Sequence, residues 1–219
     1  MHIQTDNEVI LLSTLHQFHA ELTAYSFQDL EALLYKLAPQ VICVELSPTM
    51  LVTRPHQEHK LEYEAVILPY ADAHSCTLYP MEPDEPKRSA LVQANRTLDE
   101  RVRREQPERV TAFEQFTGQL YPYLFKEFWD SPMAVHSEAT DVVFEIKHRF
   151  QSQVFGQEER QLWDEWNTCF LTCILEANRL HRGQRIVVTA GAEHRYWLRK
   201  ALKAYPEVTV IDLAEALTR

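Results

Sequence analysis

The sequence predicts an α/β protein with a mostly parallel central sheet flanked by helices. Apolar segments of strand character occur at 8–16, 41–46 and 76–81, and helical patterns separate them. A fourth apolar segment, 185–191, runs into Gly191 and is followed by another helical pattern. This alternation of strand and helix is typical of parallel sheets joined by right-handed crossovers.

The helices between the first three strands carry recognisable start and stop signals. Ser26, with Asp29 three residues later, predicts a capped helix whose leucine stripe ends before Pro39. A second helix is expected over 60–73, and Pro69 should kink or divide it. The first part of the chain therefore has the order strand, helix, strand, helix, strand.

A long helical insertion is expected between the third and fourth strands. Residues 87–182 show helical patterns without strand character, and the last helix, about 158–182, ends before Gly183, a natural left-handed terminator. A short strand over 208–211 closes the chain. We therefore predict a single α/β domain over 1–219 that contains this helical insertion.

Composition narrows the function classes. The chain has 219 residues, 45% of them hydrophobic and 25% charged, as in an ordinary globular protein. Its formal net charge of −10 disfavours nucleic acid and anionic membranes as partners. The first residues lack a signal-type leader and no run of 18 apolar residues occurs, so a cytoplasmic location is expected. The cysteines are expected to be reduced thiols, with a zinc site at Cys169 and Cys173 as a minor alternative.

Four chemically capable side chains follow predicted strands. His16, Glu45, Glu82 and His194 come at or just after the ends of the first four strands. The carboxyl ends of parallel strands share one edge of a sheet, where α/β proteins bind ligands, so these side chains should converge. Glu64, on the second helix, is expected to face the same crevice.

Two imidazoles beside carboxylates suit two kinds of hydrolytic chemistry. A divalent metal, zinc, manganese or iron, could be held by His16, Glu45 and His194, with Glu82 or Glu64 as base or as orienting partner. The same set also suits metal-free hydrolysis, in which a histidine is the general base and a carboxylate fixes its tautomer.

Other expectations concern single residues. Desolvation after an apolar strand should raise the pKa of Glu45 toward useful base strength. Trp163 and Trp166 are expected to be core anchors. Three further histidines are weaker candidates: His19 as a ligand partner of His16, and His56 and His59 in a polar loop.

Short motifs along nearly the whole chain resemble the TraB/Tiki superfamily, which includes Tiki proteases, TraB/PrgY proteins, erythromycin esterases and ChaN-like haem-binding proteins. The matching segments are Ser13-Thr-Leu-His16, Val41-Ile-Cys-Val-Glu-Leu46 and Gly191-Ala-Glu-His194, with Asn167 in the last helix of the insertion. The sequence departs from the superfamily pattern at three positions. Ser13 stands where the pattern has a glycine, and Met50 and Trp166 stand where it has arginines. Arg54 is a possible substitute for the arginine that Met50 replaces.

The resemblance implies an ancestral hydrolase-like site. We expect a hydrolase acting on an amide or ester bond of a small molecule or peptide. One alternative is a binding protein for haem or another small molecule, with Tyr25 or Tyr196 at the pocket mouth. A degenerate fold used for protein interaction is another alternative. The insertion could cap the site or form the interface of a homo-oligomer.

Overall fold

A computed structural model describes residues 7–219. The expected absence of a leader concerns residues that lie mostly outside this range. The described part contains an all-parallel sheet of five strands in the order β3-β2-β4-β1-β5. The strands are β1 (Glu8–Thr14), β2 (Val41–Val44), β3 (Thr77–Pro80), β4 (Arg185–Gly191) and β5 (Thr209–Ile211). The predicted α/β class is therefore confirmed.

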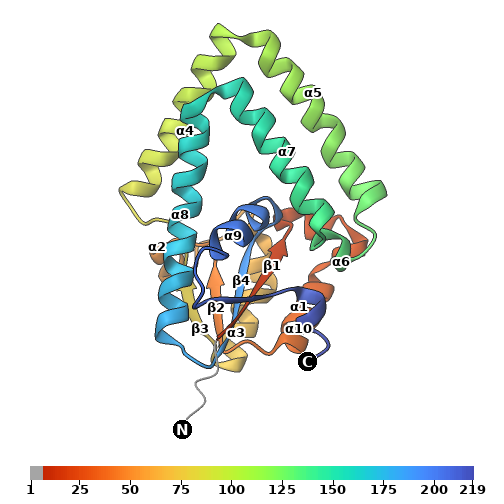
Figure 1. The fold of residues 1–219 in the computed structure, drawn as a ribbon, viewed down its shortest axis with the longest axis vertical. Coiled ribbons are helices and arrows are strands. Elements are labelled where there is room, and N and C mark those ends of the chain that lie inside the picture. The colour runs from red at the N-terminus through yellow and green to blue at the C-terminus, as the bar shows by residue number, and fades with distance from the viewer. Residues whose placement is uncertain (1–6) are drawn as a thin grey trace.

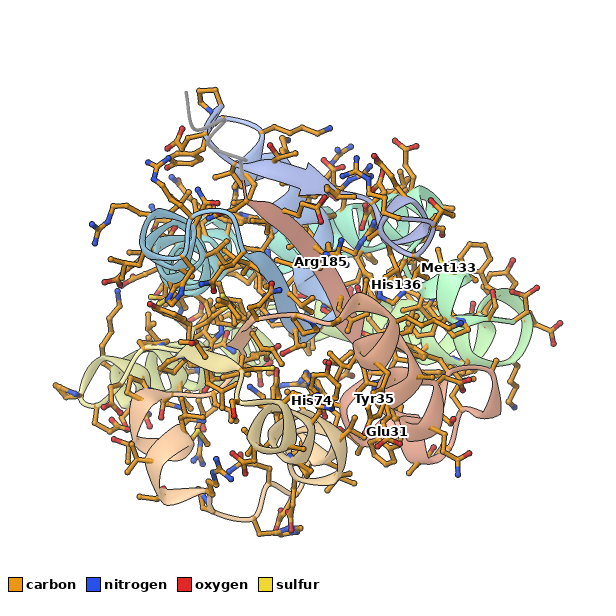
Figure 2. All side chains as sticks on the ribbon, turned by 90° about the horizontal axis from the view of Figure 1, so that it is seen from below. Glu31, Tyr35, His74, Met133, His136 and Arg185 are labelled. Carbon is orange, nitrogen blue, oxygen red and sulfur yellow. The ribbon has the colours of Figure 1, made fainter. Side chains whose placement is uncertain are left out.

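Helices cover both faces of the sheet because alternate residues of each strand point to opposite sides. On one face Ile10 and Leu12 of β1 pack with α1 (Phe27–Leu37), α3 (Leu68–His74) and α10 (Leu213–Ala216). On the other face Val9 and Leu11 pack with α8 (Gln157–Leu180) and α9 (Arg195–Leu202). Figure 2 views the sheet from below, with Arg185 at the start of β4.

The predicted start of α1 is confirmed. Ser26 accepts a hydrogen bond from the backbone N–H of Asp29 and donates its own N–H to the Asp29 carboxylate, which completes a capping box. Ala38 ends the helix in a left-handed conformation just before Pro39.

The second predicted helix, expected over 60–73, is present as a helical run over 61–74, and residues 63–67 of it are π-helical. A π-helical turn, η3 (Tyr63–Ile67), precedes α3, and Pro69 lies in the first turn of α3, where a missing N–H costs little. A short helix that was not predicted, α2 (Pro48–Thr53), is capped by Ser47, and the expected polar loop with His56 and His59 follows it.

The helical insertion rises beyond the carboxyl ends of the strands (Figure 1). Its long helices have a small core of their own, made by Leu98, Val102, Val110 and Val154. Its elements are α4 (Lys87–Glu105), α5 (Pro107–Tyr123), the π-turn η4 (Leu124–Phe128), α6 (Pro132–Val135), α7 (Glu138–Phe155) and α8.

Short 3-10 turns complete the described chain: η1 (His16–Ala20), η2 (Thr23–Tyr25) and η5 (Ala192–His194). Two of these turns, η1 and η5, follow β1 and β4 and carry the predicted site histidines. Between residues 7 and 219, none of the helices has both the length and the apolar character that crossing a membrane requires.

Candidate functional site

The strand order brings the predicted histidines and Glu45 together. β4 lies between β1 and β2, with Gly191 opposite Thr14 of β1 and Thr189 opposite Val44 of β2. His194 therefore follows the central strand, while His16 and Glu45 follow the strands on either side. The three side chains meet at the carboxyl edge, as the sequence predicted.

Gly191 permits the close approach of these groups. Its backbone N–H donates to Glu45 Oε2 at 2.7 Å. A Cβ at this position would lie 2.8 Å from His16 Nε2, a separation that real Cβ atoms almost never show. The Gly191 φ of −51° suits any residue, so the requirement is for space and not for backbone freedom.

His16 is held in an unusual backbone conformation with its imidazole oriented. Its φ of 53° is left-handed, which costs a non-glycine residue roughly 1–2 kcal/mol. The Nδ1 atom hydrogen-bonds the fully buried Glu62 carboxylate at 2.8 Å, so Nδ1 carries the proton. The Nε2 atom then faces Glu45 Oε1 at 3.7 Å. Burial lowers the pKa of His16, but Glu45 and Glu62 outweigh burial and raise it above the usual value.

His194 is oriented in the same way by a neutral partner. Its Nδ1 donates to Asn167 Oδ1 at 2.8 Å, and the Asn167 amide nitrogen donates to the Trp163 carbonyl at 2.8 Å, which fixes the amide orientation. The His194 Nε2 lone pair is therefore directed toward Glu45 Oε1, 3.9 Å away. Burial lowers the pKa of His194 to about 4, so this imidazole is neutral at neutral pH.

Lys60 neutralises the carboxylates of the site. Its ammonium contacts Glu45 Oε1 at 2.9 Å, the Glu45 carbonyl at 2.8 Å and Glu82 Oε1 at 2.5 Å, which uses all three N–H donors. Glu82 also accepts from Arg88 at 3.2 Å. Burial raises the pKa of Glu45, but Lys60 and the two histidines outweigh burial and hold this pKa well below its usual range. The expectation of a raised pKa was wrong, because it omitted these partners.

The segment 60–63 supplies three site residues that the sequence analysis missed. Besides Lys60 and Glu62, the Tyr63 hydroxyl accepts the Glu45 backbone N–H and donates to the Thr189 carbonyl, both at 2.8 Å. These contacts tie the end of β2 to β4. The sequence Lys-Leu-Glu-Tyr looked like the start of an amphipathic helix, and no local pattern marked its polar residues as buried.

A cavity of about 420 Å³ opens beside this group, between the sheet edge and the insertion. It is lined by Glu45, Lys60, Glu82, Leu91, Val92, Asn95, Lys147, His148, Gln151, Glu159, Leu162, Trp163, Trp166, Glu193 and His194. Trp163 stacks between His194 and His148, with ring centres 4.6 and 4.0 Å away. Trp166 packs against a buried core cluster, as an anchor should, and both Trp163 and Trp166 also form part of the cavity wall.

Several predicted candidates lie elsewhere. Glu64 does not face the crevice: its exposed carboxylate pairs with His56 at 2.8 Å, and it lines a separate hollow of about 140 Å³. Arg54, the possible arginine substitute, lines the same hollow and pairs with Asp72 at 2.5 Å. His59 is exposed on the surface.

Two further aromatic candidates are also outside the cavity. Tyr25 is fully buried and donates its hydroxyl to the Ser13 carbonyl, so its placement at a pocket mouth was wrong. Tyr196 lines a neighbouring groove and accepts a hydrogen bond from Trp163 Nε1.

His19 is buried and uses both ring nitrogens on backbone groups, so it is no ligand partner of His16. Haem binding stays a prediction.

The donor set can be tested for its fit to a metal. His16 Nε2, His194 Nε2 and Glu45 Oε1 are suitable ligands, and Glu62 and Asn167 orient the imidazoles as partners of metal-bound histidines do. The Lys60 ammonium already contacts the same Oε1 atom. Over residues 7–219, no group of three or more His, Cys, Asp or Glu side chains is arranged as a metal site. All four cysteines, Cys169 and Cys173 included, are free thiols.

Comparisons of the chain with protein-family models, with curated proteins and with solved structures found no match. The resemblance to the TraB/Tiki superfamily therefore stays a prediction from short motifs. Of the motif residues, His16, Glu45, Gly191, His194 and Asn167 all lie in one contact network.

Proposed function

We propose that this protein is a hydrolase that cleaves an ester or amide bond of a small molecule at the carboxyl edge of its sheet. One observation carries the proposal. Two imidazoles, each with Nδ1 fixed by a buried partner, turn Nε2 toward the same oxygen of Glu45, at 3.7 and 3.9 Å. Two proton-accepting nitrogens at one point suit the binding and deprotonation of a water molecule.

In this proposal His16 is the general base. The negative charge of Glu62 on Nδ1 stabilises the imidazolium that forms when Nε2 takes a proton from water. The resulting hydroxide adds to the acyl carbon of the substrate. The bond to the leaving group then breaks, and His16 returns its proton to the departing oxygen or nitrogen.

His194 has a different role in the same step. Because its pKa is about 4 and its Nδ1 proton is donated to Asn167, its Nε2 atom is an acceptor that orients the water without taking the proton. Glu45 stays ionised and holds the Gly191 turn in place. Lys60 keeps the paired carboxylates from repelling the developing oxyanion.

The size of the cavity favours a small substrate. A volume of about 420 Å³ lies within the range of sites that enclose small molecules. Leu91, Leu162, Trp163 and Trp166 give it an apolar wall, and Trp163 stacks on His194. The substrate proposed here is thus an ester or amide with an apolar or aromatic part.

A metal-dependent version is the second candidate, favoured by the convergence of the two Nε2 atoms on Glu45. His16, Glu45 and His194 would hold a divalent zinc, manganese or iron ion, and the ion would lower the pKa of bound water. Lys60 already contacts the Glu45 carboxylate that would hold the ion. This version predicts that Lys60→Met strengthens metal binding by removing a competing positive charge.

The test is hydrolysis of p-nitrophenyl esters and p-nitroanilides at pH 8, with and without a chelator. We expect turnover by the wild type and a loss of about 10²–10⁴-fold in His16→Gln, the range for losing a general base. His59→Gln, an exposed histidine away from the cavity, is the matched control and should be unaffected. Chelator-resistant turnover supports the metal-free version, and chelator-sensitive turnover restored by metal supports the metal version. Equal rates in wild type and His16→Gln would reject both.

The same arrangement also supports membership of the TraB/Tiki superfamily as a proposal. The motif segments that begin at Ser13 and Gly191 and the acidic strand end at Glu45 supply one site, as the motif resemblance implied. The metal-free version corresponds to the erythromycin esterase-like branch of that resemblance.

A further inference from the structure

The cavity holds one carboxylate that the proposed chemistry does not use. Glu159, in the first turn of α8, is buried with 5% of its surface exposed, and it lines the cavity. Its Oε2 atom accepts a hydrogen bond from the Ser152 hydroxyl at 2.6 Å. Between residues 7 and 219, no Lys, Arg or His side chain forms an ion pair with it.

The other carboxylates of the cavity all have cationic partners. Glu45 and Glu82 share Lys60, and Glu193 pairs with Lys147 at 2.8 Å. Lys60 has no N–H left to donate. Glu159 is therefore the cavity carboxylate that has no ion-pair partner within the described chain, and the Lys147 ammonium offsets its burial only in part.

A second acceptor beside the cavity is also unsatisfied. The Gln151 Oε1 atom is buried and accepts no hydrogen bond from residues 7–219. Gln151, Glu159 and Asn95 all line the cavity and also the groove behind it. The two arginines of that groove are paired elsewhere, Arg96 with Glu100 and Arg103 with Asp99.

A buried carboxylate without a cation is costly, and so is a buried acceptor without a donor. A ligand group with a positive charge and several N–H donors would compensate Glu159 from the cavity side. Burial raises the pKa of Glu159 and outweighs the Ser152 hydrogen bond and the charge of Lys147, which lower it. Aromatic walls at Trp163 and Trp166 suit a flat apolar body next to such a group.

We infer that the ligand of this cavity carries a cationic ammonium or amidinium-type group, which Glu159 binds as counter-ion. Naming that ligand as the substrate rests on the proposed hydrolase function. The binding site itself does not. The preferred substrates are then esters or amides of small molecules with a positively charged nitrogen group and an aromatic or aliphatic body.

Three probes of one shape and different charge test the inference by isothermal titration calorimetry at pH 7.5: benzamidine, benzamide and benzoate. The wild type should bind benzamidine at least about 10-fold more tightly than benzamide or benzoate, as expected for a charge-assisted contact. This comparison uses only the wild type, so it does not depend on the folding of any variant.

Two neighbouring variants locate the effect. Glu159→Gln, which keeps the shape and removes the charge, should bind benzamidine no better than benzamide. Glu158→Gln is the matched control, because Glu158 is the preceding residue, is exposed and pairs with Arg101 outside the cavity. It should keep the wild-type preference.

Several results would overturn the inference: no binding of benzamidine, equal binding of benzamide, tighter binding of benzoate, or an unchanged preference in Glu159→Gln. Failure of the hydrolase proposal looks different. Benzamidine binding that depends on Glu159, without turnover of any ester or amide, would support the cationic subsite and reject the hydrolase proposal. Turnover without a charge preference would reject only the proposed cationic subsite.

Discussion

At the scale of single residues, the site depends on Gly191 having no side chain. Gly191 places its backbone against the edge of His16, where an added Cβ would lie 2.8 Å from Nε2. Gly118 in α5 offers a contrast, because nothing lies within 4 Å of a Cβ there. Identical substitutions at these two glycines should therefore have opposite effects.

Gly191→Ala should displace His16 and reduce hydrolysis by at least about 10-fold, with a destabilisation of about 1–3 kcal/mol from overpacking. Gly118→Ala, in a helix interior, should stabilise by about 0.5–1 kcal/mol and leave activity unchanged. Urea unfolding and the p-nitrophenyl ester assay measure both. Full activity of Gly191→Ala would show that His16 need not lie against this backbone.

Glu62 sets the proton affinity of His16 in our account. Glu62 raises the pKa of His16, so Glu62→Gln should lower it and keep the imidazole neutral to more acidic pH. The acid limb of the kcat/KM profile should then move to lower pH, while the maximum rate falls because the imidazolium is less stabilised. An unchanged acid limb in Glu62→Gln would exclude His16 as the group that titrates.

At the scale of elements, Glu193 links the insertion to the sheet. Its carboxylate accepts from Tyr121 of α5 and from Lys147 at 2.8 Å, and it pairs with His148 of α7 at 3.1 Å. Burial raises the pKa of Glu193, but Lys147 and His148 outweigh burial and hold this pKa well below its usual range. Because Glu193 precedes His194, these contacts fix the turn that carries the site.

Removing this link should loosen the insertion. Lys147→Met leaves the half-buried Glu193 carboxylate short of its main cationic partner, which should cost about 1–3 kcal/mol. Hydrogen–deuterium exchange should rise in α5, α7 and η5, while β1 and β4 stay protected. Arg149→Met, at an exposed residue of the same helix, is the control. Uniform exchange changes across the molecule would contradict a local docking role.

A second element, α6, holds β1 through a neutral histidine. His136 Nε2 accepts the Ser13 backbone N–H at 2.8 Å. In Figure 2, His136 is separate from the contact between Tyr35 of α1 and His74 of α3. Burial lowers the pKa of His136 to about 3. Below the unfolded pKa near 6.5 the unfolded chain therefore binds a proton that the folded chain excludes.

This difference predicts acid sensitivity. The contribution of His136 is complete above about pH 6.5 and is lost progressively as the pH falls toward 3, by about 2 kcal/mol at pH 5. His136→Gln can still accept the Ser13 N–H but does not titrate. Its loss of stability between pH 7.5 and 5, measured by urea unfolding, should be about 2 kcal/mol smaller than that of the wild type. Parallel losses in both proteins would contradict the assignment.

At the scale of the whole molecule, apolar strands and their endings predicted both the sheet and the meeting of His16, Glu45 and His194. Each of these features is local in sequence. Because the carboxyl ends of parallel strands share one edge of the sheet, the side chains that follow these strands lie near each other. Strand order was not predictable, because nothing in 41–46 says that β4, far along the chain, inserts between β1 and β2.

The partners of the site were harder to predict than its centre. Lys60 and Glu62 are polar residues at a helix start, and the same pattern also describes a solvated surface. Only the fold turns them inward, so the sequence could not show that Lys60 lowers the pKa of Glu45 or that Glu64 faces away. The wall formed by Trp163 and Trp166 likewise depends on how the insertion is placed over the sheet edge.

The central claim is that one imidazole is ready to take a proton while the other is kept neutral. Nitrogen-15 NMR of histidine side chains, titrated from pH 8 to 5.5 and assigned with His16→Gln and His194→Gln, measures this directly. We predict that His16 becomes protonated with a pKa above 6.5, while His194 stays the neutral Nδ1–H tautomer to the end of the titration. Protonation of His194 near its ordinary pKa, or of His16 only well below 6.5, would contradict the account.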